Sequence, residues 1–143
     1  MKKYNLNIYY DSQKNFVYKN GNVLLNGQIS EGVLGPGWYQ PEQDSVWISK
    51  RARITFRSGS KGDLKVKGYL PNFLSPNTII LKINDKIIYQ GDHSGTFEIQ
   101  KHIDMNTMIM LDIELSDSVI PKDKGLNQDM RELGAIINNI NTN

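Results

Sequence analysis

The residues of this sequence best suited to binding a ligand lie in one stretch, residues 35–47, which holds both tryptophans of the chain. Flat aromatic rings stack on the C–H faces of sugar rings, while nearby carboxylates and amides bind sugar hydroxyls. We therefore predict carbohydrate contacts from Trp38, Tyr39, Gln40 and Glu42. The alternative is structural: Trp38 and Trp47 close one end of a folded sandwich, and Glu42 satisfies buried backbone donors. For Trp47, which begins a strand, the structural role is favoured.

Recognised catalytic motifs are absent from the sequence. Asp92-His93-Ser94 holds the residue types of a hydrolase triad, but a triad is assembled in space, and sequence neighbours rarely point at one another. We interpret this tripeptide, with Gly95, as a polar turn. There is no nucleophile elbow, phosphate loop or His-Glu-x-x-His motif, and no cysteine for thiol chemistry, disulfides or zinc. A carboxylate pair for glycoside hydrolysis is set by distance in the fold, so the sequence does not address it. We expect a protein that is not an enzyme.

A basic stretch between Lys50 and Lys67 is the second candidate site. It contains Lys50, Arg51, Arg53, Arg57, Lys61, Lys65 and Lys67 against one acid, Asp63. We expect several of these cations to share the outward face of two successive strands, where they could bind phosphate, an anionic glycan or a lipid surface. The favoured alternative is a solvated sheet face with cross-strand ion pairs to acids such as Asp112 and Glu114.

The elements that must position these residues are short strands. Apolar residues alternate with polar ones over 4–10, 51–57, 64–67 and 109–116, which is the two-residue period of half-buried strands. Asn84-Asp85-Lys86 is a hairpin turn between two apolar runs. We expect a short helical turn near 127–133, followed by a last strand from Ala135. The pattern predicts an all-β antiparallel sandwich or jelly roll.

Length and charge restrict the class of protein. The chain has 143 residues, which suits a single domain over 1–143, and a formal net charge of +2, which is too balanced for a dedicated nucleic-acid binder. No run of about 18 apolar residues predicts a transmembrane helix. Met1-Lys2-Lys3 is followed by polar residues rather than an apolar run, so we expect no secretory signal and a cytoplasmic location.

Several short motifs follow one another in a recognisable order. They are Gly37-Trp38-Tyr39-x-x-Glu42 with Trp47 and Arg51-Ala52-Arg53-Ile54; Leu64-Lys65-Val66-x-Gly68-Tyr69-Leu70-Pro71; Ile83-Asn84-Asp85-Lys86; Leu115-Ser116-x-Ser118-x-x-Pro121; and Asp129-x-Arg131-x-Leu133-Gly134. This order resembles a β-sandwich domain appended to bacterial glycosyltransferases. One departure is Asp85, which stands where that family usually has the glycine of an Asn-Gly hairpin. The resemblance covers residues 33–140, whereas residues 1–32 match no family motif.

The resemblance implies a galactose-binding-like or jelly-roll sandwich that acts as a non-catalytic carbohydrate-binding module beside a glycosyltransferase catalytic domain. The sugar contacts it implies come from exposed aromatics and amides: Trp38, Tyr39, Gln40, Tyr69 and Asn72. Trp47, Asp129, Arg131 and Gly134 are then mainly structural, with Asp129 and Arg131 paired and Gly134 allowing close packing.

Two further expectations stay open at this stage. Jelly-roll carbohydrate modules often carry a structural calcium ion, for which Glu31, Glu42 and Asp44 are candidate oxygen ligands, although no dense Asp-x-Asp loop supports it. The alternative function is a protein-interaction or oligomerisation domain, including a homodimer, in which the same aromatic residues bury against a partner.

Overall fold

The computed structural model describes residues 18–19, 22–25, 28–39, 42 and 45–142. The strand predicted over 4–10 lies outside these residues. The described chain forms β1 (Tyr18–Lys19), β2 (Asn22–Leu25), β3 (Gln28–Leu34), β4 (Val46–Ile48), β5 (Arg51–Arg57), β6 (Asp63–Leu70), β7 (Asn77–Ile83), β8 (Lys86–His93), β9 (Gly95–His102), β10 (Met108–Leu115) and β11 (Ala135–Thr142). Two 3₁₀ turns, η1 (Asn72–Leu74) and η2 (Pro121–Lys124), complete the elements.

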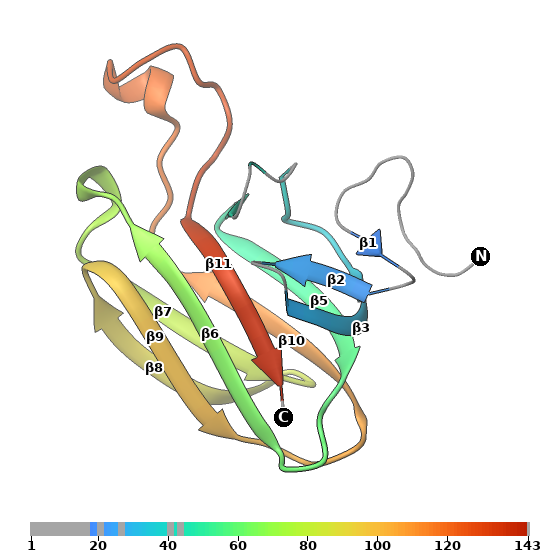
Figure 1. Ribbon diagram of the computed structural model, residues 1–143. Helices are drawn as coiled ribbons and strands as arrows, with labels where there is room; N and C mark the ends of the chain where they lie inside the picture. Colours follow the sequence, from blue (N-terminus) through green and yellow to red (C-terminus); the bar gives the residue numbers. More distant parts are fainter. Residues whose placement is uncertain (1–17, 20–21, 26–27, 40–41, 43–44, 143) are drawn as a thin grey trace.

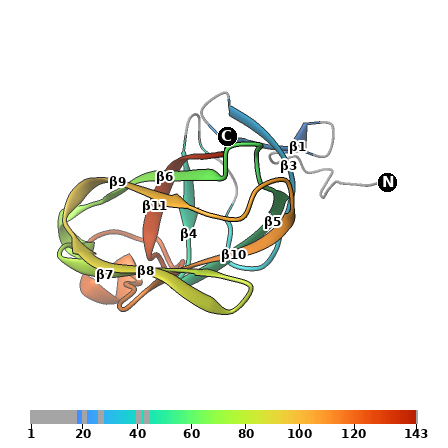
Figure 2. The same ribbon diagram turned by 90° about the horizontal axis from the view of Figure 1, so that it is seen from below.

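The strands form two antiparallel sheets that pack face to face (Figures 1 and 2). The larger sheet has seven strands in the order β1-β2-β3-β5-β10-β7-β8, and the smaller has four in the order β4-β11-β6-β9. The predicted all-β sandwich is therefore confirmed. None of the helical elements among the described residues is long and apolar enough to cross a membrane.

Alternation along the strands places the core between the sheets. On β5, Ala52, Ile54 and Phe56 are fully buried, and on β10 the same holds for the alternate apolar residues from Ile109 to Leu115. Leu64 and Val66 of β6 face them from the smaller sheet. Successive side chains of a strand point to opposite faces, so the intervening residues cover the two outer faces of the sandwich.

The chain passes from the larger to the smaller sheet at Ser94, between β8 and β9. Gly95 follows with a φ of 67°, in the left-handed region that favours glycine. The three triad-like residues have separate surroundings: Thr78 Oγ1 donates to Asp92 Oδ1 over 2.6 Å, the Tyr89 hydroxyl lies 2.6 Å from His93 Nε2, and Ser94 is exposed. The polar turn predicted over these residues is therefore corrected: Asp92 and His93 end β8, and Ser94 alone links it to β9.

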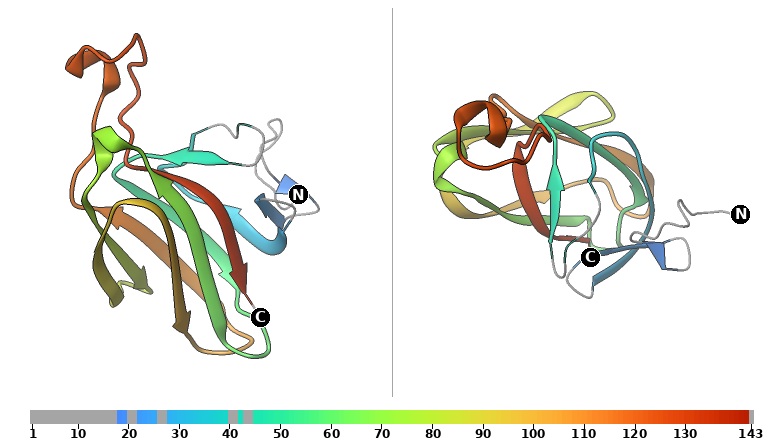
Figure 3. Two further views of the ribbon diagram at one scale, coloured as in Figure 1. Left: turned by 60° about the vertical axis from the view of Figure 1, so that its left-hand side comes forward. Right: turned by 90° about the horizontal axis from the view of Figure 1, so that it is seen from above.

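The helical turn expected near 127–133 does not form. Asn127 Oδ1 accepts the Asp129 N–H over 2.7 Å, and Asp129 Oδ1 accepts the Arg131 N–H over 3.0 Å. Such side-chain bonds to nearby backbone groups compete with helical hydrogen bonds. The 3₁₀ turn forms earlier, at η2, where Pro121 fits the first helical position. The segment from 116 to 134 projects beyond the sandwich and returns to begin β11 (Figure 3).

Candidate functional site

Trp38, the first predicted sugar contact, is half-buried and packs against the core. Its indole Nε1–H donates to the Arg53 carbonyl oxygen over 2.7 Å, and its main chain forms a bridge with Ile48 of β4. Gly37 precedes it with a φ of 100°, and a side chain there would meet the Arg51 carbonyl, so glycine is required for this approach to β5. The indole N–H is thus already paired within the protein, and the ring supports the fold.

Tyr39 is held in a similar way. Its hydroxyl donates to the Glu132 carbonyl over 2.8 Å, and its N–H donates to the Trp47 carbonyl over 3.0 Å. The Arg131 guanidinium lies over the Tyr39 ring, 5.3 Å from the ring centre. Glu42 is exposed, with Oε2 at 3.7 Å from Arg131 Nη1. Gln40 lies outside the described residues.

The predicted pairing of Asp129 with Arg131 is present. Both guanidinium nitrogens Nε and Nη2 donate to the Asp129 carboxylate, the shorter bond being 2.7 Å. These bonds, together with the Arg131 N–H, lower the pKa of Asp129 to about 2. Gly134 packs closely as predicted, since a Cβ there would lie 2.5 Å from the Ser49 carbonyl oxygen. The ion pair is local to the returning segment, whereas Gly134 brings the start of β11 against Ser49.

The depressed pKa of Asp129 predicts a specific acid sensitivity. A carboxylate whose folded-state pKa lies below its unfolded value stabilises the fold above the unfolded pKa, near 4, and loses this contribution as the pH falls through the folded value near 2. Because the pair is open to water on one side, we expect about 1 kcal/mol. Urea unfolding should show Asp129→Asn, which keeps the backbone acceptor, to be less stable than wild type at neutral pH. The difference should vanish towards about pH 2; a constant difference would contradict the ion-pair origin.

The basic stretch divides between the two sheets, which corrects the prediction that its members share one face. Arg51, Arg53 and Arg57 belong to β5 of the larger sheet, whereas Lys65 and Lys67 belong to β6 of the smaller one. Alternation alone does not reveal that successive strands lie in opposite layers. Each set still points outward, but to opposite sides of the molecule.

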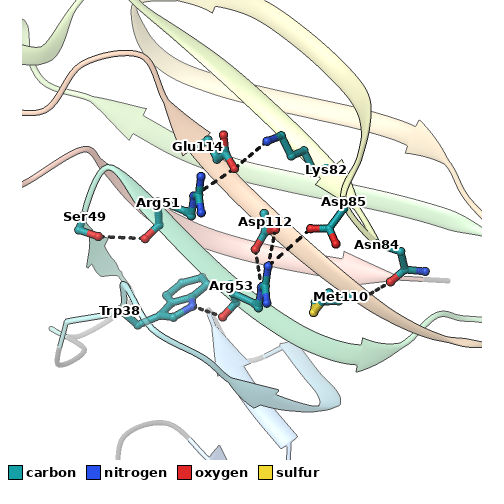
Figure 4. Close-up of polar contacts among 10 residues, drawn as sticks. All are labelled: Trp38, Ser49, Arg51, Arg53, Lys82, Asn84, Asp85, Met110, Asp112 and Glu114. Carbon is teal, nitrogen blue, oxygen red and sulfur yellow. Dashed lines mark hydrogen bonds and ion pairs between the residues drawn. The ribbon is translucent and has the colours of Figure 1, made fainter.

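On the larger sheet the expected ion pairs with acids of β10 are confirmed (Figure 4). Arg53 Nε and Nη2 donate to the two carboxylate oxygens of Asp112 over 2.8 and 3.0 Å, which raises the pKa of Arg53. Asp112 is only 2% exposed. Arg51 and Lys82 both reach Glu114 Oε2, at 3.1 and 3.2 Å. These cations are occupied within the protein, so this face is a structural ion-pair network.

The smaller sheet presents aromatic side chains at the end where β6 stops and β11 begins. Strand register places Trp47, Ile136, Tyr69 and Thr96 in one row across the outer face of β4, β11, β6 and β9. Phe73 of η1 lies beside this row, with its ring centre 6.4 Å from that of Trp47. Tyr69 is 41% and Phe73 37% exposed. We call Trp47, Tyr69 and Phe73 the aromatic cluster.

Two predicted residues lie at this cluster or beside it in the chain, and a third belongs to a bordering loop. Tyr69 is part of the cluster, and Asn72 is exposed next to Phe73 in η1. The loop of Tyr39 borders it, because the Tyr39 N–H bonds the Trp47 carbonyl. Phe73 was not among the predicted contacts. It follows Asn72 directly after the Pro71 strand exit, and an aromatic residue at such a strand end is the signal that could have identified it.

A metal centre does not emerge from the described residues. Among them, no three histidine, aspartate or glutamate side chains lie together in a way that could hold an ion. Of the three candidate calcium ligands, Asp44 lies outside the described residues and Glu31 is described only as part of β3. Glu42 is beside Arg131. The calcium site therefore stays a prediction.

No protein-family model and no curated protein matches the chain. Among solved structures it is similar to a family 35 carbohydrate-binding module from Clostridium thermocellum, in its native structure. The match has 8% sequence identity, covers 76% of this chain and 85% of that chain, and has a TM-score of 0.42. At that score the likeness is too distant to support a function, and the fold assignment rests on the sheet topology described above.

Proposed function

We propose that this protein is a non-catalytic carbohydrate-binding module whose sugar platform is the aromatic cluster. The observation that carries the proposal is the exposure of Tyr69 and Phe73 beside Trp47 at one end of a sheet face. Exposed aromatic rings offer apolar area to the C–H faces of a sugar, and stacking on them needs no cofactor. Polar groups around the platform then select hydroxyl orientation.

Polar groups that could bind sugar hydroxyls lie near the aromatic cluster. Asn72 carries an amide that can both donate to and accept from a hydroxyl, and Thr96 adds a hydroxyl at the other end of the row. Glu42 has an exposed carboxylate in the bordering loop. Trp38, Tyr39 and Gln40 remain proposed contacts at the margin, where only the outward parts of the first two rings are accessible.

The association with a glycosyltransferase is part of the proposal. It is supported by the ordered motifs over residues 33–140, whose order resembles that of the glycosyltransferase-associated sandwich domains. In this arrangement the module would hold an acceptor glycan while a separate catalytic domain transfers sugar to it.

Removing an exposed ring tests the function directly. On a glycan array, wild-type protein should bind at least one class of glycan. Tyr69→Ala or Phe73→Ala should weaken that binding about two- to tenfold, since a stacked aromatic contributes about 0.5–1.5 kcal/mol beyond its area. Both side chains are exposed, so the melting temperature should change little. Ile87→Ala is a matched control, because Ile87 is exposed on β8 of the other sheet. An array without any bound glycan would reject the function.

A second candidate is protein interaction, and the projecting segment 116–134 favours it. Leu126 is 50% and Met130 70% exposed on this segment. Exposed apolar side chains on an ordered projection are typical of contact surfaces. A stable dimer in sedimentation velocity, lost on Met130→Ser, together with an empty glycan array, would favour this function over sugar binding.

A further inference from the structure

We infer that the outer face of the smaller sheet has a second subsite, at the end opposite the aromatic cluster, which binds an anionic group of the same ligand. The ligand class is therefore a linear glycan that carries carboxylate or phosphate groups. This inference rests on the proposed function, because it extends the same binding face.

The subsite is a hollow of about 390 Å³ where β6 begins and β9 and β11 end, at the lower end of these strands in Figure 1. It is lined by Asp63, Leu64, Lys65, Gln100, Lys101, His102 and Asn141. Register sets Asp63 opposite His102, and Lys65 opposite both Gln100 and Asn141. The outer face thus contributes the Lys65 ammonium group, two amides and the His102 imidazole beside the Asp63 carboxylate. Lys101 pairs with buried Leu64 and lines the hollow from the other side of the strand, so the lining is rich in hydrogen-bond donors.

The acids at this end are already engaged. Glu98 Oε2 accepts from Gln100 Nε2 over 3.0 Å and lies 3.8 Å from Lys65 Nζ. Asp63 Oδ1 lies 3.6 Å from His102 Nδ1. By contrast, Lys67 and Lys101 have no ion-pair partner among the residues that the structure describes. On the larger sheet Arg51, Arg53 and Lys82 are paired with acids, whereas Lys86 is exposed without an ion-pair partner among the described residues and serves below as a control.

The geometry requires an extended ligand. The outward residues of β6 run Tyr69, Lys67, Lys65, so they lead from the aromatic cluster to the hollow along one strand. At about 3.3 Å per residue, Tyr69 and Lys65 are about 13 Å apart. A single sugar ring stacked on Tyr69 does not reach the hollow, whereas a linear chain lying along β6 does. Lys67 would then face the middle of the chain.

The same charges disfavour a membrane or a nucleic acid. Asp63 and Glu98 stand among the lysines of this face, and a dense anionic surface would be repelled by them. The formal net charge of +2 gives little general attraction for polyanions. An isolated anionic group on an otherwise neutral chain can instead be placed in the hollow, which Lys65 and Lys101 line.

The test uses the full chain on an array of linear oligosaccharides in which each neutral chain stands beside a carboxylated and a phosphorylated counterpart of equal length. The acidic member of a pair should bind more tightly. Lys65→Gln and Lys101→Gln, which remove ammonium groups that line the hollow, should each weaken binding of the acidic member about two- to fivefold, the range of an exposed ion pair, and weaken binding of the neutral member less. Added salt should reduce the difference in affinity between the acidic and the neutral member of each pair. The carboxylated and phosphorylated arms identify which anion is preferred.

Lys86→Gln is the matched control, since Lys86 is an exposed lysine on β8 of the larger sheet. Equal weakening by this control would show unspecific charge attraction and overturn the inference. If neutral chains bind through Tyr69 as tightly as acidic ones, the anion subsite is wrong while the carbohydrate-binding function stands. If no chain binds, both are rejected.

Discussion

Replacing Gly68 by alanine is expected to lower the free energy of unfolding by about 3 kcal/mol, at the upper end of the cost of overpacking a core. Gly68 lies in β6, paired with Ile137 of β11 on one side and Phe97 of β9 on the other. An added Cβ would lie 2.2 Å from the Ile136 carbonyl oxygen and 2.5 Å from Phe97 Cζ. Because strands hold β6 from both sides, it has little room to shift.

Gly95→Ala is the matched control for this experiment. A Cβ at Gly95 meets nothing within 4 Å, so only its left-handed backbone opposes the change. That conformation costs about 1 kcal/mol for a residue other than glycine. Urea unfolding of both variants measures the difference. Equal losses would contradict the packing of Phe97 against Gly68.

Trp38→Ala is expected to cost about 2 kcal/mol of stability, less than the loss of a fully buried ring, because Trp38 is half-buried against the core. The change also removes the indole bond to the Arg53 carbonyl. Trp38→Phe keeps most of the ring and loses only that bond, so it should cost about 1 kcal/mol. Thermal unfolding should therefore show a larger loss of stability for Trp38→Ala than for Trp38→Phe.

The same pair of variants decides between two locations for sugar binding. With the platform at the aromatic cluster, folded Trp38→Phe protein should bind glycan as wild type does, whereas Tyr69→Ala should not. If Trp38→Ala abolished binding and left the melting temperature unchanged, Trp38 would be the main sugar contact. The loop would then be the principal site.

The strands and their buried faces were predictable because each is encoded locally. The apolar residues of β5 and β10 alternate with polar ones, and every inward position so predicted is buried. Layer assignment was not predictable in this way. Arg51 and Lys65 have the same alternating context, yet their strands lie in opposite sheets, because pairing of β5 with β10 and of β6 with β9 depends on distant segments.

The site was predictable in part, for a related reason. Residue type indicates which side chains can stack on a sugar, but only the fold decides which of them keep an open face. Trp38 and Trp47 are both half-buried, whereas the smaller aromatic side chains of Tyr69 and Phe73 are exposed to solvent. The resemblance implies Tyr69 and Asn72 as contacts, and their role in binding stays a prediction. The contact of Phe73 with Trp47 and the hollow near Asp63 and His102 could not be predicted, because both join residues that are far apart in the sequence.

The strand order of the smaller sheet determines how much of the chain is needed to form its outer face. Its strands β4, β6, β9 and β11 are drawn from almost the whole described chain, and between them the chain repeatedly visits the other sheet. Bringing such distant segments together costs the entropy of closing long loops before the strand contacts form. This cost slows folding. We therefore expect that the proposed binding face does not form in a shorter peptide, and that it forms together with the opposite, ion-paired sheet.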